Sequence, residues 1–97
     1  MSGHRRISSQ LLFDLRNKVA VQHFMADALG IHVKYSEGYY RFQCPLCKEM
    51  RTAINENTNL GRCFRCNRNF NPIDITIEVR GCSFLDAVGL VQRYLKD

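Results

Sequence analysis

Two Cys-x-x-Cys pairs constrain the fold of this chain more than any other feature of its sequence. Cys44 and Cys47 form the first pair, Cys63 and Cys66 form the second, and fifteen residues separate the pairs. Each pair is a short turn that presents two thiolates to one ion, and two such pairs at this spacing are typical of a tetrahedral metal site. The sequence therefore predicts one structural zinc ion bound by Cys44, Cys47, Cys63 and Cys66.

Other chemistry is compatible with the same residues. A rubredoxin-like site with four thiolates would bind iron, and spacing alone does not distinguish the two metals. A free Cys-x-x-Cys pair could carry out redox chemistry, although two pairs at this spacing are better explained by one shared ion. Because cysteine fills all four positions, no coordination site stays open for an activated water, which argues against metal catalysis. Cys82 lies outside both pairs and is expected to be a small buried side chain.

The length and composition of the chain indicate one small domain. Its 97 residues, 45% of them hydrophobic, leave no room for a catalytic domain beside the metal module. We expect a flexible basic tail at residues 1–7 and a single domain over residues 8–97. A structural zinc contributes on the order of 10 kcal/mol or more, so the central segment is expected to need metal to fold.

The location of the protein is expected to be cytoplasmic, without membrane contact. No apolar run approaches the roughly 18 residues that cross a bilayer, and the start of the chain lacks the apolar stretch of a signal peptide. Thiols stay reduced in the cytoplasm, which favours metal binding over disulfides for the paired cysteines.

Apolar periodicity predicts helices on both sides of the cysteine region. Ser8 or Ser9 is placed to cap a first helix, and a second helix follows with Gly30 as its left-handed stop. Near the C-terminal end, Ser83 and Asp86 resemble a capping box that opens a helix with one apolar stripe.

The segment after Phe70 fits two descriptions. Its isoleucines and valine alternate as a strand would over residues 73–79. However, Asn71 and Pro72 followed by Asp74 form a typical helix opening, and Gly81 supplies a stop. A helix is favoured here.

Two β-hairpins are predicted between the helices. Their strands are short alternating or aromatic-rich runs joined by polar turns, at residues 31–35 with 39–43 and at residues 51–55 with 60–64. The second strand of each hairpin leads directly into a cysteine pair. The predicted fold class is therefore α+β: a zinc ribbon, meaning a small antiparallel sheet with two cysteine knuckles, flanked by N-terminal and C-terminal helices.

The excess positive charge of the chain lies in this cysteine region. The formal net charge is +5, and residues 41–68 hold six basic side chains against two acidic ones. Aromatic side chains alternate with these cations, as in proteins whose rings stack on unpaired bases while cations contact phosphates. The candidate nucleic-acid contacts are Lys34, Tyr39, Arg41, Lys48, Arg51, Arg62, Phe64, Arg65 and Arg68. A solvated face is the alternative. Strand alternation places Tyr39 and Arg41 on the exposed face, with Tyr40 and Phe42 on the opposite face.

Five segments in chain order carry a resemblance to a known family. They are Leu29-Gly30-Ile31-x-Val33-Lys34, Tyr40-Arg41-Phe42-x-Cys44-Pro45-Leu46-Cys47, Cys63-Phe64-x-Cys66, Asp74, and Gly81-x-Ser83-Phe84-x-Asp86-Ala87-Val88. Together they resemble the N-terminal zinc-binding domain of bacterial and phage DNA primases, over residues 15–95. The resemblance implies a zinc ribbon that contacts single-stranded template DNA and helps to select where primers start.

Several positions differ from the pattern of that family. The family usually has histidine where this chain has Cys47, and Thr-Pro-Ser-Phe where it has residues 51–54. Arg65, Asn67 and Asn69 stand where glycines are usual, although asparagine tolerates left-handed backbone. We expect no polymerase domain in this chain, so it is not expected to synthesise a primer alone.

Three classes of function follow from these observations. The first is a non-catalytic zinc ribbon that binds single-stranded DNA in replication or on a mobile element, alone or beside a separate primase or helicase subunit. DNA and RNA are not distinguished at this stage. The second is a protein–protein interaction module in which terminal helices, through Phe84, Val88 and Leu95 or through Leu11 and Leu15, dock a replication or transcription partner. An enzyme is disfavoured, because the chain has no paired carboxylates, no Ser/His/Asp arrangement and no phosphate-binding glycine loop.

Overall fold

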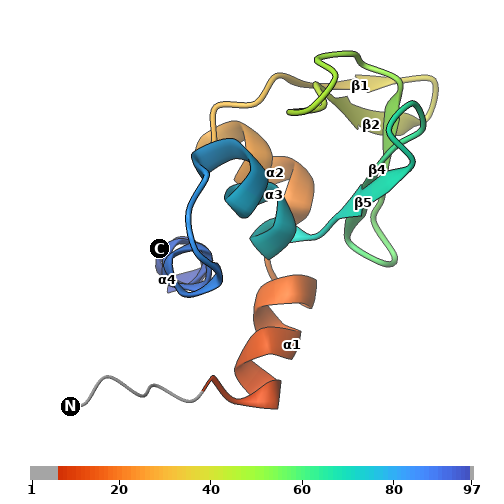
Figure 1. The fold of residues 1–97 in the computed structure, drawn as a ribbon. Coiled ribbons are helices and arrows are strands. Elements are labelled where there is room, and N and C mark those ends of the chain that lie inside the picture. The colour runs from red at the N-terminus through yellow and green to blue at the C-terminus, as the bar shows by residue number, and fades with distance from the viewer. Residues whose placement is uncertain (1–6, 97) are drawn as a thin grey trace.

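The structure, a computed structural model, describes residues 7–96 and places strands at one end and helices at the other (Figure 1). The elements in chain order are α1 (Ser9–Asn17), α2 (Val21–Asp27), β1 (Val33–Ser36), β2 (Tyr39–Phe42), β3 (Thr52–Asn55), β4 (Leu60–Cys63), β5 (Arg68–Phe70), α3 (Pro72–Arg80) and α4 (Phe84–Lys96). The predicted α+β class, with two antiparallel sheets beside four clustered cysteines and helices before and after them in the chain, is confirmed. Within residues 7–96, no helix is both long enough and apolar enough to cross a bilayer.

The predicted tail falls almost entirely outside the described residues. Only Ile7 of residues 1–7 belongs to the described part, and its half-buried side chain packs against the core. Ser8 then caps α1, because its hydroxyl oxygen accepts a hydrogen bond from the N–H of Leu11 at 3.0 Å.

The bend between α1 and α2 is held by a residue far along the chain. Ala20 occupies the cap position of α2 and has no side chain that could accept a hydrogen bond. Instead, Oδ1 of Asn59 accepts from the N–H of Val21 at 2.9 Å. Nδ2 of Asn59 donates to the carbonyl oxygens of Arg16 and Val19, at 2.6 Å each. The turn between β3 and β4 therefore fixes the path of the N-terminal helices.

The segment after Phe70 is a helix, as favoured from the sequence. The side chain of Asn71 accepts from the N–H of Asp74 at 2.8 Å, and the carboxylate of Asp74 accepts from the N–H of Asn71 at 3.3 Å. Gly81 ends α3 in the left-handed region at φ 60°. The apolar alternation misleads here because α3 packs against helices and strands, so that Ile73 and Ile75 are both buried although they are two residues apart.

Both predicted hairpins are present, and a third strand extends the second one. β1 pairs with β2, while β3, β4 and β5 form a three-stranded antiparallel sheet in that order. In the first hairpin, Glu37 and Gly38 both have positive φ, 55° and 86°, which matches the turn that two-residue hairpins prefer. β5 was not predicted, because three residues are too short to show a strand period.

The two sheets share one core beneath them. The hydroxyl of Thr52 accepts from the N–H of Phe42 at 2.8 Å and donates to its carbonyl at 2.6 Å. The rings of Phe42 and Phe70 meet edge to face with centroids 6.2 Å apart. Gly61 lies directly against Phe42, since a Cβ at Gly61 would come within 2.8 Å of that ring. Only glycine fits at this position.

Strand β4 divides its side chains between two faces. Gly61 and Cys63 are buried toward the core, whereas Leu60 and Arg62 lie on the opposite, outer face. The register of the sheet pairs Arg62 with Ala53 on one side and with Asn69 on the other. The core therefore packs against the inner face of the sheet and not against the outer face.

Candidate metal centre and nucleic-acid interface

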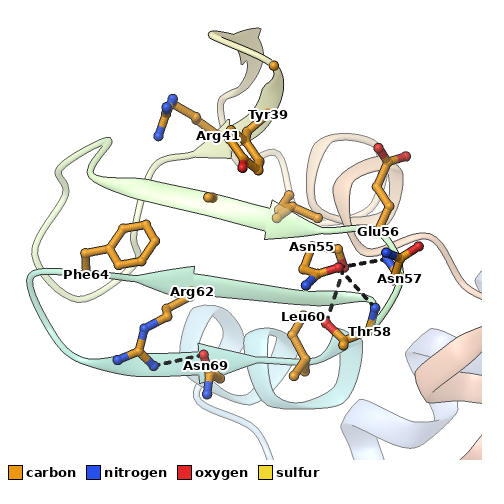
Figure 2. A pocket seen from close by; sticks show the side chains of 13 residues that line it. Tyr39, Arg41, Asn55, Glu56, Asn57, Thr58, Leu60, Arg62, Phe64 and Asn69 are labelled. Carbon is orange, nitrogen blue, oxygen red and sulfur yellow. Dashed lines mark hydrogen bonds between the residues drawn. The ribbon is translucent and has the colours of Figure 1, made fainter.

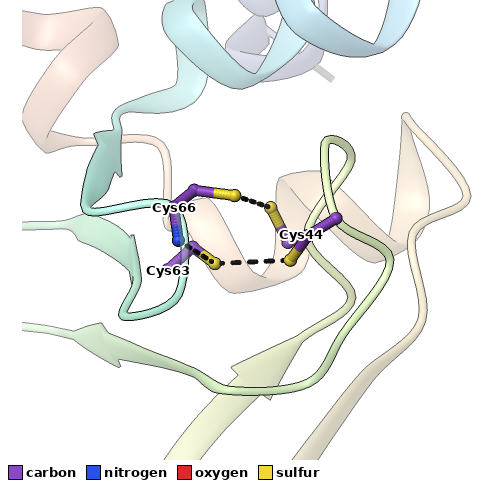
Figure 3. Close-up of side chains that lie close together, drawn as sticks. Cys44, Cys63 and Cys66 are labelled. Carbon is purple, nitrogen blue, oxygen red and sulfur yellow. Dashed lines mark hydrogen bonds between the residues drawn. The ribbon is translucent and has the colours of Figure 1, made fainter.

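The four predicted cysteine ligands come together between two turns (Figure 3). Sγ of Cys44 lies 3.9 Å from Sγ of Cys66, and Sγ of Cys47 lies 3.7 Å from Sγ of Cys63. All four sulfur atoms lie within 4.8 Å of one another. A tetrahedron of thiolates about 2.3 Å from a zinc ion has edges of about 3.8 Å. The four cysteines therefore form one metal-binding site whose dimensions suit zinc.

Each turn reaches this geometry through a left-handed residue directly after its second cysteine. The first turn follows β2 and has Lys48 at φ 65°, and the second joins β4 to β5 and has Asn67 at φ 59°. Asparagine is a common occupant of this region, but lysine is not. The tolerance of Asn67 for left-handed backbone was predicted from the sequence, and the conformation of Lys48 was missed.

Backbone N–H groups point at the sulfur atoms inside both turns. The N–H of Leu46 lies 3.4 Å from Sγ of Cys44, and the N–H of Cys66 lies 3.4 Å from Sγ of Cys63. Such groups stabilise the thiolate form, which is the form that binds a metal. The sequence of each turn thus provides ligands together with part of the charge compensation that they need.

The pKa values of Cys44, Cys63 and Cys66 are shifted by burial and by their neighbours. Burial raises the pKa of Cys44, and burial together with the neighbouring thiols raises the pKa of Cys66 to about 12. Burial acts in the same direction on Cys63, but the N–H groups of Cys66 and Arg65 and the neighbouring thiols outweigh it and lower its pKa. Protons therefore compete with a metal ion for this site.

A carboxylate beside the metal site neutralises two of the predicted nucleic-acid contacts. Glu49, just after the first turn, forms an ion pair with Arg65 in the second turn. Nε of Arg51 lies 3.8 Å from the same carboxylate. The hydrogen bond to Glu49, together with the charge of that carboxylate, raises the pKa of Arg65. Both cations are exposed, and exposed ion pairs contribute little to stability, so Glu49 mainly reduces the positive potential there.

Three further predicted cations, Arg68, Lys34 and Lys48, lie outside the sheet face. Arg68 pairs with Glu78 of α3 at 3.0 Å. Lys34 and Lys48 are exposed, and neither has a carboxylate within 4.0 Å among the described residues. These three side chains, Arg51 and Arg65 are not among the residues that line the hollow over the sheet.

The other four predicted contacts do line one hollow, of about 820 Å³ (Figure 2). They are Tyr39, Arg41, Arg62 and Phe64. The hollow lies over the outer face of the β3–β4–β5 sheet, and strand β2 borders it. Phe64 and Tyr39 are 56% and 54% exposed, so both rings are accessible to a ligand. The predicted exposure of Tyr39 is confirmed.

Arg41 is held in place at the β2 side of the hollow. Its guanidinium lies over the ring of Tyr39, 5.9 Å from the centroid. Nη1 donates to the carbonyl of Thr52 at 2.8 Å, and Nη2 donates to Glu37 at 3.4 Å. Arg41 is half-buried rather than fully exposed, because it also links β2 to β3.

Arg62 is held in the same way at the opposite side. Its guanidinium lies 5.9 Å from the centroid of the Phe64 ring. Nη1 donates to Oδ1 of Asn69 at 3.1 Å, and Nη2 donates to Oδ1 of Asn67 at 2.6 Å. Within residues 7–96 no carboxylate lies within 4.0 Å of Arg62, so its charge is free to attract an anion.

Sequence analysis missed the carboxamides of the hollow. Asn55, Asn57 and Asn69 all line it, and Asn69 lies directly across from Arg62 in the sheet. Asn55 could have been found from the sequence, because it lies two residues from Ala53 on a predicted strand and residues at this spacing share one face of a sheet. No comparable signal existed for Asn69, because strand β5 itself was not predicted.

No protein-family model matches the chain, and comparisons with curated proteins and with solved structures give no significant match. The resemblance to the zinc-binding domain of primases stays a prediction from sequence motifs.

Proposed function

We propose that this protein is a non-catalytic, zinc-stabilised module that binds single-stranded DNA in the hollow over its three-stranded sheet. One observation carries the proposal: an arginine–aromatic pair from β2 and another from β4 and its following turn line the same open hollow. Residues 44 and 47 and residues 63 and 66 lie beside these elements, so a shared ion would hold them in register. We further propose that the module acts in DNA replication, beside a separate primase or helicase subunit.

The chemistry of the donor set supports zinc as the ion. Four thiolates suit a soft tetrahedral ion, and zinc imposes no geometry of its own on them. Cys44 and Cys63 are buried, which limits the access of water to the site. In this arrangement the ion supplies a cross-link between the two turns and leaves no open coordination position for catalysis. Metal analysis of the purified protein is expected to find one zinc and no iron per chain.

The chemistry of the hollow supports a single-stranded ligand. Stacking of an unpaired base on an aromatic ring contributes about 1–3 kcal/mol, and it requires an exposed ring face. Tyr39 and Phe64 each provide one, with a guanidinium alongside to meet a phosphate. A paired duplex hides its base faces, so it gains nothing from these rings. The volume of about 820 Å³ is also within the usual range of ligand sites, roughly 300–1,000 Å³.

The test is binding of a fluorescent dT12 oligonucleotide across a salt series, with the zinc-loaded protein. Each phosphate contact to a single strand contributes about −0.7 to the slope of log K against log salt. Arg62→Gln together with Phe64→Ala is expected to weaken binding at least tenfold and to make the salt slope shallower by about 0.7. Arg51→Gln is the matched control, because it removes the same charge outside the hollow.

Two results would contradict the proposal. One is an affinity for dT12 that does not change with salt. The other is an Arg62→Gln/Phe64→Ala protein that binds as tightly as the Arg51→Gln control while keeping its zinc. Either result would leave the metal site intact and remove the hollow from consideration.

Protein docking by the terminal helices is the second candidate. Leu15 and Val88 of the predicted apolar stripes are buried in the core of the domain itself. Phe84, Leu85 and Leu95 of α4 are exposed instead, with Leu85 at 56%. A partner that co-purifies with the wild-type protein, is lost on Leu85→Ser and is retained on Arg62→Gln would favour this role.

A further inference from the structure

Helix α4 has one face toward the core and an opposite face that borders a groove. The residues of α4 buried in the core are Ala87, Val88 and Val91. Asp86, Gly89 and Arg93 lie on the opposite side of the helix, because successive helical residues are about 100° apart. Together with Leu90 they line a groove of about 460 Å³ at the helical end of the molecule (Figure 1). These four residues are called the groove face of α4.

Gly89 is not required by the packing of the domain itself. It lies inside a helix of 13 residues, where glycine is less favourable than alanine. A Cβ at Gly89 would have nothing within 4 Å apart from its chain neighbours and the backbone of its own helix, whereas a Cβ at Gly61 would meet the ring of Phe42. The space beside Gly89 therefore lets a second molecule approach the backbone of α4 closely.

The two charges of the groove face have no partner within the described part of the chain. Among residues 7–96, neither the carboxylate of Asp86 nor the guanidinium of Arg93 takes part in an ion pair or a hydrogen bond. Asp86 and Arg93 are two helical turns apart, about 10 Å along the axis. Gly89 and Leu90 lie midway between them. The groove face thus has opposite charges at its two ends, with a small and a large residue in the middle.

We infer that the groove face of α4 binds the same face of a second copy of this chain, with the two helices antiparallel. Two-fold symmetry about the midpoint between Gly89 and Leu90 places Asp86 of each copy opposite Arg93 of the other. It also places Leu90 of each copy opposite Gly89 of the other, so a large side chain meets the space that glycine leaves. The groove face is therefore complementary to itself in charge and in size.

The inference does not rest on DNA binding, because the hollow lies over the three-stranded sheet and shares no residue with this groove. A helix of 13 residues is only about 20 Å long, so the contact is small and a weak, reversible dimer is expected.

The test is sedimentation equilibrium of the zinc-loaded protein over a range of concentrations, under reducing conditions so that no disulfide joins two copies. The wild-type protein is expected to change from monomer to dimer in the micromolar range. Asp86→Arg and Arg93→Asp each place like charges opposite one another at both ends of the helix pair, so each is expected to weaken dimerisation about tenfold or more. Asp14→Arg is the matched control, because it makes the same charge change on α1, and it is expected to dimerise like the wild type.

A mixture of the two charge variants separates a specific interface from a general effect of charge. Asp86→Arg carries two cations on the groove face, and Arg93→Asp carries two carboxylates. In a mixed dimer every cross-chain pair is therefore of opposite charge. The mixture is expected to dimerise as tightly as the wild type although neither variant does so alone, and this recovery also shows that both variants are folded.

Gly89→Gln tests the close approach of the two helices. Glutamine favours a helix more than glycine does, and the position has room for a side chain, so the zinc-loaded monomer is expected to melt at the same temperature as the wild type or higher. Its side chain fills the space that Leu90 of the second copy needs, so dimerisation is expected to be lost. A residue with a purely structural role would not combine these two effects.

Three results would overturn the inference. One is a wild-type protein that stays monomeric up to millimolar concentration. Another is a dimer whose association is unchanged by Asp86→Arg and by Gly89→Gln. The third is a mixture of the two charge variants that stays monomeric while each variant keeps its zinc and its helical circular dichroism. A monomeric wild type that loses a co-purifying protein on Gly89→Gln would likewise overturn it, and would assign the groove to a different partner.

Discussion

Replacing Asn59 is expected to destabilise this fold more than its place in a polar turn would indicate. The residue is only 6% exposed, and its side chain holds three backbone groups of the α1–α2 bend. Its own backbone lies in the left-handed region at φ 57°. Asn59 therefore combines two effects, the hydrogen bonds of its side chain and the left-handed conformation of its backbone. Different substitutions separate these two effects.

The magnitude follows from the groups that lose their partners. Asn59→Gly leaves the N–H of Val21 and the carbonyls of Arg16 and Val19 without the side chain that they contact, at about 1 kcal/mol each, so a loss of about 3 kcal/mol is expected. Asn59→Ala loses the same hydrogen bonds and also places a Cβ in the left-handed region, which costs about 1 kcal/mol more. Asn59→Asp is expected to be at least as severe as alanine, because its carboxylate faces two carbonyl oxygens where Asn59 has donors.

The assay is urea denaturation followed by circular dichroism, with a fixed excess of zinc so that metal binding contributes equally to every variant. Asn57→Ala is the control, because it alters the same turn at an exposed residue, and it is expected to change the free energy of unfolding by less than about 0.5 kcal/mol. An Asn59→Gly protein within about 0.5 kcal/mol of the wild type would refute the reasoning. Equal stability of the glycine and alanine variants would refute the contribution of the left-handed backbone alone.

Three further predictions concern the metal site and the helices. Lys48→Gly is expected to stabilise the zinc-loaded protein by about 0.5–1 kcal/mol, because glycine adopts the left-handed backbone without strain, and the thermal midpoint measures this. Acidification is expected to release the metal, because burial raises the pKa values of Cys44 and Cys66 and protons displace the ion as the pH falls. A zinc-sensitive dye would follow the release. Retention of zinc at pH 4 would contradict this prediction. Tyr94 donates to Asp27 at 2.9 Å, and its pKa is raised by burial and by that carboxylate. The hydrogen bond from Tyr94 to Asp27 therefore contributes fully to stability below pH 10, and this contribution is lost as the pH rises through the higher pKa of Tyr94 in the folded state. The difference in melting temperature between the wild type and Tyr94→Phe is expected to shrink above pH 10.

The metal site and most elements could be predicted from the sequence because their signals are local. Two cysteine pairs define two turns, and Asn71, Asp74 and Gly81 mark the ends of α3 through their own side chains or backbone freedom. Each signal spans only a few residues, so it does not depend on where the rest of the chain lies. These are the features that the structure bears out.

The features that could not be predicted depend on contacts between distant segments. The hydrogen bonds of Asn59 join positions about forty residues apart, and nothing near Asn59 in the sequence indicates them. The hollow exists because Tyr39 on one sheet and Phe64 beside another face the same space. Lys48 adopts a left-handed backbone because the metal turn requires it, against the preference of its residue type.

The side chains of strand β4 alternate between two faces, and this has a consequence for how the sequence of such a protein can change in evolution. Gly61 and Cys63 belong to the core and the metal turn, while Leu60 and Arg62 line the hollow on the outer face. Mutations at the outer positions are therefore expected to cost less in folding than mutations at the inner positions, although Arg62 also holds Asn67 and Asn69 by hydrogen bonds. Mutations at the inner positions remove the fold before any new ligand can be tried. One four-residue strand thus holds two sets of positions that evolve under separate constraints.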